Sequence, residues 1–84
     1  MKITFKLFAT LTDYLPAQSR HGNRMELEVA PNASISQIIE PFALPARLVH
    51  LVLVNGVYVQ PAERLTRTLK DGDTLAIWPP IAGG

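Results

Sequence analysis

Five short segments of this chain have the composition of β-strands, and only one stretch between them has the spacing of a helix. Residues 2–9 and 25–29 alternate apolar and polar side chains, which is typical of strands that are buried on one face. Residues 51–54, 57–59 and 74–78 are rich in branched and aromatic residues. In a chain of 84 residues, this pattern predicts one small domain. Its fold class is α+β, a mixed sheet of about five strands packed on one main helix.

The predicted helix lies between the second and third strands. Ser34 and Gln37 have the spacing of a capping box, in which each side chain bonds the backbone of the other residue. Apolar residues follow at helical spacing, namely Ile35, Ile38, Ile39 and Phe42. Because proline lacks a backbone N–H and clashes with the preceding turn, Pro41 predicts that the helix stops or kinks near Glu40.

Turn signals indicate how the strands are joined. Asn55-Gly56 is a strong signal for a two-residue hairpin between the third and fourth strands. Asp71-Gly72 predicts a turn before the last strand. With this order, we expect the first and last strands to lie side by side and parallel in the centre of the sheet.

The connection over residues 62–70 is largely polar. Within it, Leu65 and Leu69 are predicted to fill the core. Arg64, Arg67 and Lys70 form a small basic cluster, which we interpret as a solvated loop. The alternative is that this cluster docks into an acidic groove of a partner.

No constellation of residues indicates a catalytic or metal site. The chain has no cysteine, which excludes disulfides, a thiolate nucleophile and a cysteine-bound metal. His21 and His50 share no metal-ligand spacing with a third residue. We interpret His50 as a partly buried structural residue and His21 as solvated.

Composition restricts the partners. A formal net charge of +1 argues against a dedicated nucleic-acid binder, which would carry a strong basic excess. No apolar run approaches the roughly 20 residues that span a membrane. Because residues 1–8 also lack the apolar region of a signal peptide, a cytoplasmic location is expected.

The end of the sequence has an unusual composition. It reads Trp78-Pro79-Pro80-Ile81-Ala82-Gly83-Gly84. Prolines stiffen a chain, and glycines permit close approach of the backbone, so this segment suits insertion into the narrow active site of another protein. The α-carboxylate of Gly84 would then be the reactive group. The alternative is a frayed end without a function.

Two aromatic residues near this segment predict an interaction surface. Phe8 and Trp78 fall on the faces opposite the inward residues of their own strands. If these strands are neighbours, both rings line one exposed apolar patch, with Val52 or Val54 nearby. We expect Phe8, Trp78 and Pro79 to contact a partner. The alternative is that a loop or the turn at Tyr14 covers the two rings.

Residues 69–84 resemble the C-terminus of the molybdopterin synthase small subunit and its ubiquitin-like sulfur-carrier relatives. The shared pattern is an Asp-Gly-Asp turn, an apolar strand, two prolines, an apolar residue, a small residue and two glycines. The element order likewise resembles the β-grasp, or ubiquitin-like, fold. The resemblance implies a β-grasp domain over residues 1–78 and an extended Gly-Gly tail over residues 79–84.

The resemblance also implies a function. An enzyme similar to a ubiquitin E1 would use ATP to adenylate the carboxylate of Gly84, and a sulfur donor would convert it to a thiocarboxylate. Residues Pro80, Ile81, Ala82 and Gly83 would insert into a sulfur-accepting enzyme such as the molybdopterin synthase large subunit. The carrier itself would be non-catalytic and would bind no cofactor or metal.

Several alternatives share this activation chemistry. The sulfur acceptor can belong to the synthesis of thiamine thiazole, the tungsten cofactor or cysteine, or to tRNA thiolation. A ubiquitin-like modifier would instead attach Gly84 to lysines of other proteins. A third class is a binding module with an inert tail, which would use only the patch around Phe8 and Trp78.

Overall fold

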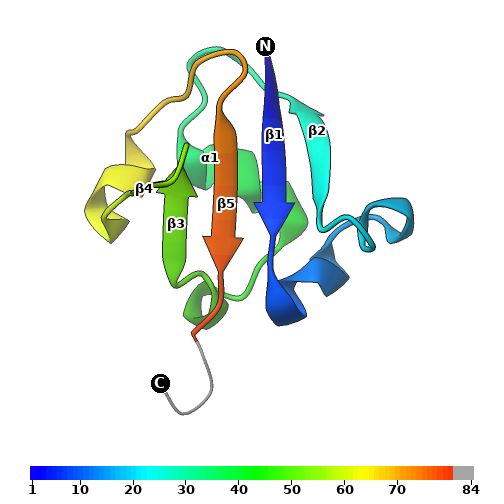
Figure 1. Cartoon of the computed structure of the whole chain (residues 1–84). Helices are drawn as coiled ribbons and strands as arrows, with labels where there is room; N and C mark the ends of the chain where they lie inside the picture. Colours follow the sequence, from blue (N-terminus) through cyan, green and yellow to red (C-terminus); the bar gives the residue numbers. More distant parts are fainter. Residues whose placement is uncertain (81–84) are drawn as a thin grey trace.

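The computed structural model describes residues 1–80 and contains a five-stranded sheet with the strand order β2-β1-β5-β3-β4 (Figure 1). The strands are β1 (Lys2–Leu7), β2 (Arg24–Glu28), β3 (Leu51–Val54), β4 (Val57–Tyr58) and β5 (Thr74–Trp78). β1 and β5 are parallel neighbours in the centre, and the other pairs are antiparallel. The predicted position of the first and last strands is therefore confirmed.

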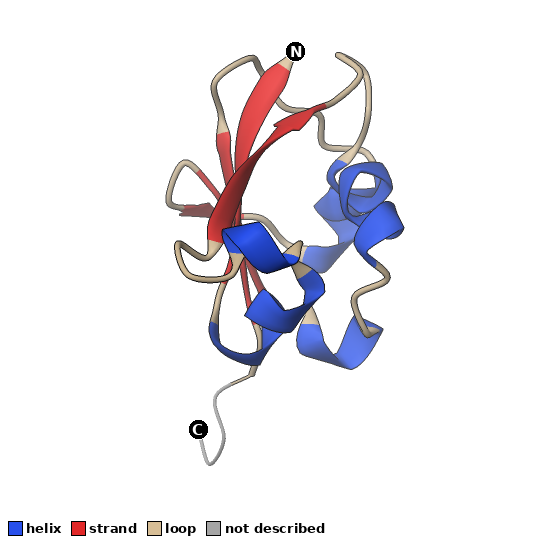
Figure 2. Cartoon of the chain, turned by 90° about the vertical axis from the view of Figure 1, so that its right-hand side faces the viewer, coloured by secondary structure: helices blue, strands red, loops and turns tan. Residues whose placement is uncertain are grey.

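One face of the sheet is covered by helical segments, as the side view in Figure 2 shows. They are α1 (Ile35–Ile39) and the short 3-10 helices η1 (Ala9–Tyr14), η2 (Ala17–Ser19), η3 (Glu40–Phe42), η4 (Ala46–Leu48) and η5 (Pro61–Leu65). Within residues 1–80, no helix has the length and apolar character needed to cross a membrane.

The core lies between the sheet and these helices. The buried side chains of the strands and of α1 include Ile3, Phe5, Leu7, Ile35, Ile38, Val52, Val54, Leu75 and Ile77. In β1, β5 and α1 they follow the period of two and the helical spacing that the sequence predicted. In β3 the burial also alternates, which the continuous apolar run did not predict. A mixed sheet packed on one main helix in this strand order is the β-grasp arrangement.

The start and the end of α1 are fixed by the residues predicted to do so. The Oγ of Ser34 accepts a hydrogen bond from the backbone N–H of Gln37 at 3.2 Å. The side-chain Oε1 of Gln37 accepts one from the N–H of Ser34 at 2.8 Å, which completes the capping box. At Pro41 the α-helix has already given way to η3. This 3-10 turn carries Phe42 to the core, where its ring lies 4.6 Å from that of Phe5.

The connection over residues 62–70 differs in part from the prediction. Leu69 is buried as predicted, but Leu65 is 70% exposed and does not fill the core. The reason is η5, which begins at Pro61. This 3-10 helix turns Leu65 to the surface and Arg64 to the interior.

Arg64 is only 8% exposed, so its assignment to a solvated basic loop was wrong. Its guanidinium donates hydrogen bonds to three backbone carbonyl oxygens, those of Val49, His50 and Val59. It also lies 5.9 Å from the ring centroid of Tyr58. These contacts provide the hydrogen-bond partners that a buried charged group requires. Arg67 and Lys70 are exposed, as predicted.

Hydrogen bonds link the hairpin between β3 and β4 to the turn before β5. Asn55 and Gly56 both have positive φ, 51° and 82°, as a two-residue hairpin turn with a primed geometry requires. The side chain of Asn55 donates to Asp73 Oδ1 at 2.9 Å and accepts from the backbone N–H of Thr74 at 2.9 Å. Asp73 Oδ2 also accepts from the N–H of Lys70 at 2.8 Å.

These bonds make stability depend on pH. The hydrogen bond from the backbone N–H of Lys70 lowers the pKa of the Asp73 carboxyl below its ordinary value, and the bond from the amide of Asn55 adds to this effect. A carboxyl whose pKa is lowered by folding stabilises the protein above its ordinary pKa. That contribution disappears as the pH falls through the lowered pKa.

We therefore expect Asp73→Asn to lower the free energy of unfolding by about 1 kcal/mol at neutral pH, because it replaces an acceptor with a donor. The difference from the parent protein should vanish in acid. Urea unfolding over a pH series measures both. Asp13→Asn, at an exposed aspartate, serves as the control and should change neither value. A difference that persists in acid would contradict this account of Asp73.

Candidate functional site

The face of the sheet opposite the helices carries a row of side chains fixed by the strand register. Lys6 on β1 pairs with Ala76 on β5, Ala76 pairs with Leu53 on β3, and Leu53 pairs with Tyr58 on β4. Because directly paired residues point to the same face, these four side chains lie side by side on the face away from α1.

Two aromatic rings lie at one end of this row. The register of β1 and β5 pairs Leu7 with Ile77, so the next residues, Phe8 and Trp78, are also neighbours. Their rings are stacked, with centroids 3.7 Å apart and an interplanar angle of 2°. The predicted proximity of Phe8 and Trp78 is confirmed. Trp78 keeps 37% of its surface exposed, so neither a loop nor the turn at Tyr14 covers it completely.

Together these residues form one surface that we call the apolar face. It consists of Phe8, Leu51, Leu53, Tyr58, Ala76 and Trp78. Leu51 joins it because it pairs with Trp78. Tyr58 and Trp78 are its most exposed members, and Ala76 is buried between its neighbours. Exposed apolar surface marks sites of protein interaction, and tryptophan and tyrosine are enriched at the energetic centres of interfaces. The partner role of Phe8 and Trp78 stays a prediction.

The neighbours proposed for the two rings were wrong. Val52 and Val54 point into the core. Leu51 and Leu53 lie on the open face, where one of the two valines was expected. The sequence supplies the pairing of this hairpin but not the choice of its buried face. A two-residue turn at Asn55-Gly56 pairs Val54 with the residue after the turn, so the parity of the hairpin also places Leu53 opposite Tyr58.

The chain leaves the sheet directly beside the apolar face. β5 ends at Trp78, whose carbonyl oxygen accepts a hydrogen bond from the backbone N–H of His50 at 3.2 Å. Pro79 is then buried, and Pro80 is exposed. The burial of Pro79 in the isolated chain does not test its predicted contact with a partner, which stays a prediction. The predictions for Ile81, Ala82, Gly83 and Gly84 lie outside the described residues.

The two histidines do not form a site. The side chains of His21 and His50 are both exposed, so the prediction that His50 is partly buried was wrong. The backbone of His50 donates to the carbonyl oxygen of Trp78 and accepts from Arg64. Within the described part of the chain, no three His, Asp or Glu side chains lie close enough to hold a metal ion.

Comparison with known proteins identifies similar chains. The family model described as Mut7-C ubiquitin matches residues 1–82. No curated protein sequence matches the chain.

Solved structures share the fold over nearly the whole length. The putative molybdopterin converting factor subunit 1 from Pyrococcus furiosus is 23% identical, with a TM-score of 0.67 over 96% of this chain and 99% of that one. Small archaeal modifier protein 1 from Haloferax volcanii is 21% identical, with a TM-score of 0.67 over 95% and 98%. A chain in the complex of subunits 1 and 2 of the molybdopterin-converting factor from Helicobacter pylori is 18% identical. Its TM-score is 0.63 over 100% of this chain and 100% of that one.

The stacking of Phe8 on Trp78 makes a measurable prediction. In a double-mutant cycle of Phe8→Leu and Trp78→Leu, we expect a coupling free energy of roughly 0.5–1.5 kcal/mol, because stacked aromatic pairs add this much to their burial. Urea unfolding of the four proteins gives the value. The control cycle pairs Phe8→Leu with Tyr58→Leu on a strand three positions away, and its coupling should be near zero. Equal coupling in both cycles would contradict a specific contact of the two rings.

Proposed function

Since the chain belongs to the Mut7-C ubiquitin family, we propose that it works as a ubiquitin-like carrier protein. In this proposal the carboxylate of Gly84 is the group that is activated and loaded with sulfur. The apolar face is the surface by which other proteins hold the carrier.

One observation carries the proposal. Trp78 is at once the last residue of β5, a member of the apolar face and the residue that precedes the Pro79-Pro80 pair. A protein that docks on the apolar face therefore lies next to the point from which the last six residues continue. The docking surface and the reactive terminus would then be used by the same partner.

The chemistry requires activation because a carboxylate is a poor acyl donor. In the first step, a carboxylate oxygen of Gly84 attacks the α-phosphorus of ATP, and pyrophosphate leaves. In the second step, the sulfur of a donor attacks the acyl carbon, and AMP leaves with the electron pair. The donor that we propose is a persulfide, so the product of this step is an acyl disulfide. A thiol then attacks the donor's sulfur in that disulfide, which releases the thiocarboxylate of Gly84 and forms a disulfide between the thiol and the donor. An E1-like enzyme would supply the catalytic groups, since the carrier contributes the terminus and the docking surface.

The acceptor that we propose is an enzyme of molybdopterin synthesis. Two of the similar structures are described as subunits of molybdopterin-converting factor, and the one from Helicobacter pylori is a complex with subunit 2. By analogy, a larger subunit would cover the apolar face, and the segment from Pro80 to Gly83 would enter its active site. The carrier would bind no cofactor of its own.

A second candidate is protein modification, because another similar structure is described as a small archaeal modifier protein. In that case, the activated Gly84 would form an isopeptide bond with a lysine amine. The two functions differ in their product and not in their activation step.

Mass spectrometry of the protein purified from its own host tests the proposal. We expect the C-terminal peptide to gain the mass difference between one sulfur and one oxygen, and to lose it on alkaline hydrolysis. A terminus that stays unmodified after incubation with ATP, a sulfur donor and the E1-like enzyme of the host would contradict the proposal. Conjugates that survive reducing, denaturing gels would favour the modifier.

Deletion of Gly83 and Gly84 should abolish loading with sulfur and leave the fold intact. The sheet and its core lie within residues 1–80, so the free energy of unfolding should change by less than about 0.5 kcal/mol. Thermal unfolding and the loading reaction measure the two effects. Trp78→Ala is the matched comparison, since it should weaken docking of the partner and keep the reactive terminus. Full function of the deletion variant would support a binding module instead.

A further inference from the structure

β2 lies at one edge of the sheet. Its register with β1 shows which of its backbone N–H and C=O groups point away from the sheet. Met1 and Val29 exchange both of their backbone hydrogen bonds, at 2.9 and 2.8 Å. In an antiparallel pair such exchange recurs at every second residue, so Leu27 and Met25 also bond to β1. The N–H and C=O groups of the alternate residues, Arg24, Glu26 and Glu28, point away from the sheet. Among residues 1–80 these groups have no strand beside them.

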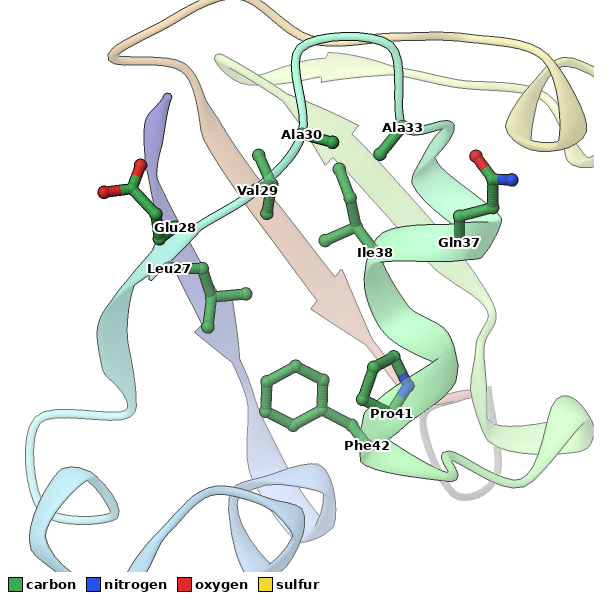
Figure 3. A pocket seen from close by; sticks show the side chains of 9 residues that line it. All are labelled: Leu27, Glu28, Val29, Ala30, Ala33, Gln37, Ile38, Pro41 and Phe42. Carbon is green, nitrogen blue, oxygen red and sulfur yellow. The ribbon is translucent and has the colours of Figure 1, made fainter.

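An apolar groove lies next to this free edge. It has a volume of about 310 Å³ and runs between β2, α1 and η3. Figure 3 shows Leu27 and Val29 on one side of the groove, with Ile38 and Phe42 facing them from the helical side. We call this surface the β2–α1 groove. It opens on the side of the sheet opposite the apolar face.

The exposed side chains of β2 carry a fixed charge pattern. Arg24, Glu26 and Glu28 alternate with the residues that face the core and are exposed, and Glu28 borders the groove with its carboxylate turned outward (Figure 3). The carboxylate of Glu28 lies 3.1 Å from the N-terminal ammonium and is 70% exposed. Charges on an edge strand prevent pairing with unrelated strands. A strand that does pair here must therefore carry the complementary charges.

We propose that the β2–α1 groove binds an extended segment of another protein, which adds to β2 as an antiparallel sixth strand. Its backbone would bond the outward N–H and C=O groups of Arg24, Glu26 and Glu28. The residues opposite Met25 and Leu27 would be apolar, because paired residues share a face. The residue opposite Leu27 would enter the groove, and the residue opposite Met25 would lie on the same face beside it.

The charges define the segment more closely. Read from its N-terminus, it runs from the position opposite Glu28 to the position opposite Arg24. Its sequence is therefore basic, apolar, basic, apolar and acidic. A second copy of this chain is a poorer occupant. When two β2 strands overlap fully in the antiparallel sense, Arg24 of each copy lies opposite Glu28 of the other, but Glu26 lies opposite Glu26 at the centre, and like charges in direct opposition are destabilising. The central basic residue therefore distinguishes the proposed segment from a second copy.

Nuclear magnetic resonance of the full chain tests the proposal with a capped peptide that contains Lys-Val-Lys-Val-Glu between Gly-Ser flanks. We expect hydrogen exchange of the amides of Arg24, Glu26 and Glu28 to slow, since these N–H groups gain acceptors. The charge-reversed peptide, Glu-Val-Glu-Val-Lys, should bind about tenfold more weakly, because three favourable cross-strand pairs become unfavourable.

A variant of the protein provides a matched control. Glu26 is exposed, so Glu26→Lys should leave the spectrum of the core unchanged. It should weaken the first peptide several-fold and restore binding to a peptide with glutamate at the central position. This exchange of preference identifies the charge pair and is independent of the chemistry at Gly84.

Other outcomes would overturn the proposal. One is the absence of any response of the three amides at about 1 mM peptide, a concentration that reveals even weak binding. Another is a response confined to the apolar face around Trp78. A third is equal affinity for both charge patterns. Self-association through β2 without binding of peptide would assign the edge to a second copy of the chain.

Discussion

The parallel pairing of β1 with β5 determines most of the other features of this structure. A parallel pair cannot be closed by a tight turn, so the chain between the two strands must cross over the sheet. Here that crossing contains β2, α1 and the hairpin of β3 and β4. The helical segments pack on one face as part of the crossing and bury the inward side chains there. The opposite face consequently stays open in the centre of the sheet.

The same register creates the aromatic pair. Once Leu7 pairs with Ile77, Phe8 and Trp78 follow as neighbours at the ends of parallel strands. Their stacked rings cover part of each other and leave Trp78 partly exposed beside Leu51. The apolar face thus depends on the central pairing, although its side chains contribute little to the core. A substitution that shifted this register by one residue would move every side chain of β5 to the other face.

The sequence was sufficient for the parts of the fold that short-range chemistry controls. The capping box of Ser34 and Gln37 and the hairpin at Asn55-Gly56 each depend on residues close together, and both were predicted correctly. The run Leu51–Val54 was harder, since all four residues are apolar and the run has no alternation that shows which face is buried. Pairing with β5 decides this, and such pairing is a long-range property.

Arg64 illustrates the same limit. Its charge and its polar neighbours in the sequence suggested a solvated loop. Its actual partners are the carbonyl groups of a segment about 15 residues away and of the strand end before η5, which no local pattern reveals. A buried guanidinium bonded to carbonyl groups joins the segment before β3 to η5, without a carboxylate partner among residues 1–80. The interior of this small domain therefore contains a charged side chain that the local sequence pattern predicted to be exposed.

The apolar face and the β2–α1 groove are separated by the sheet itself. The apolar face is centred on β5 and β3, whereas the groove lies beyond β1, at the far edge and on the opposite side. Neighbouring strands are about 4.8 Å apart, so the backbone of β2 lies roughly 10 Å from that of β5. A narrow segment in the groove would leave the apolar face and the exit after Trp78 accessible. The geometry therefore allows one protein to hold the chain by its edge while another uses the end of β5.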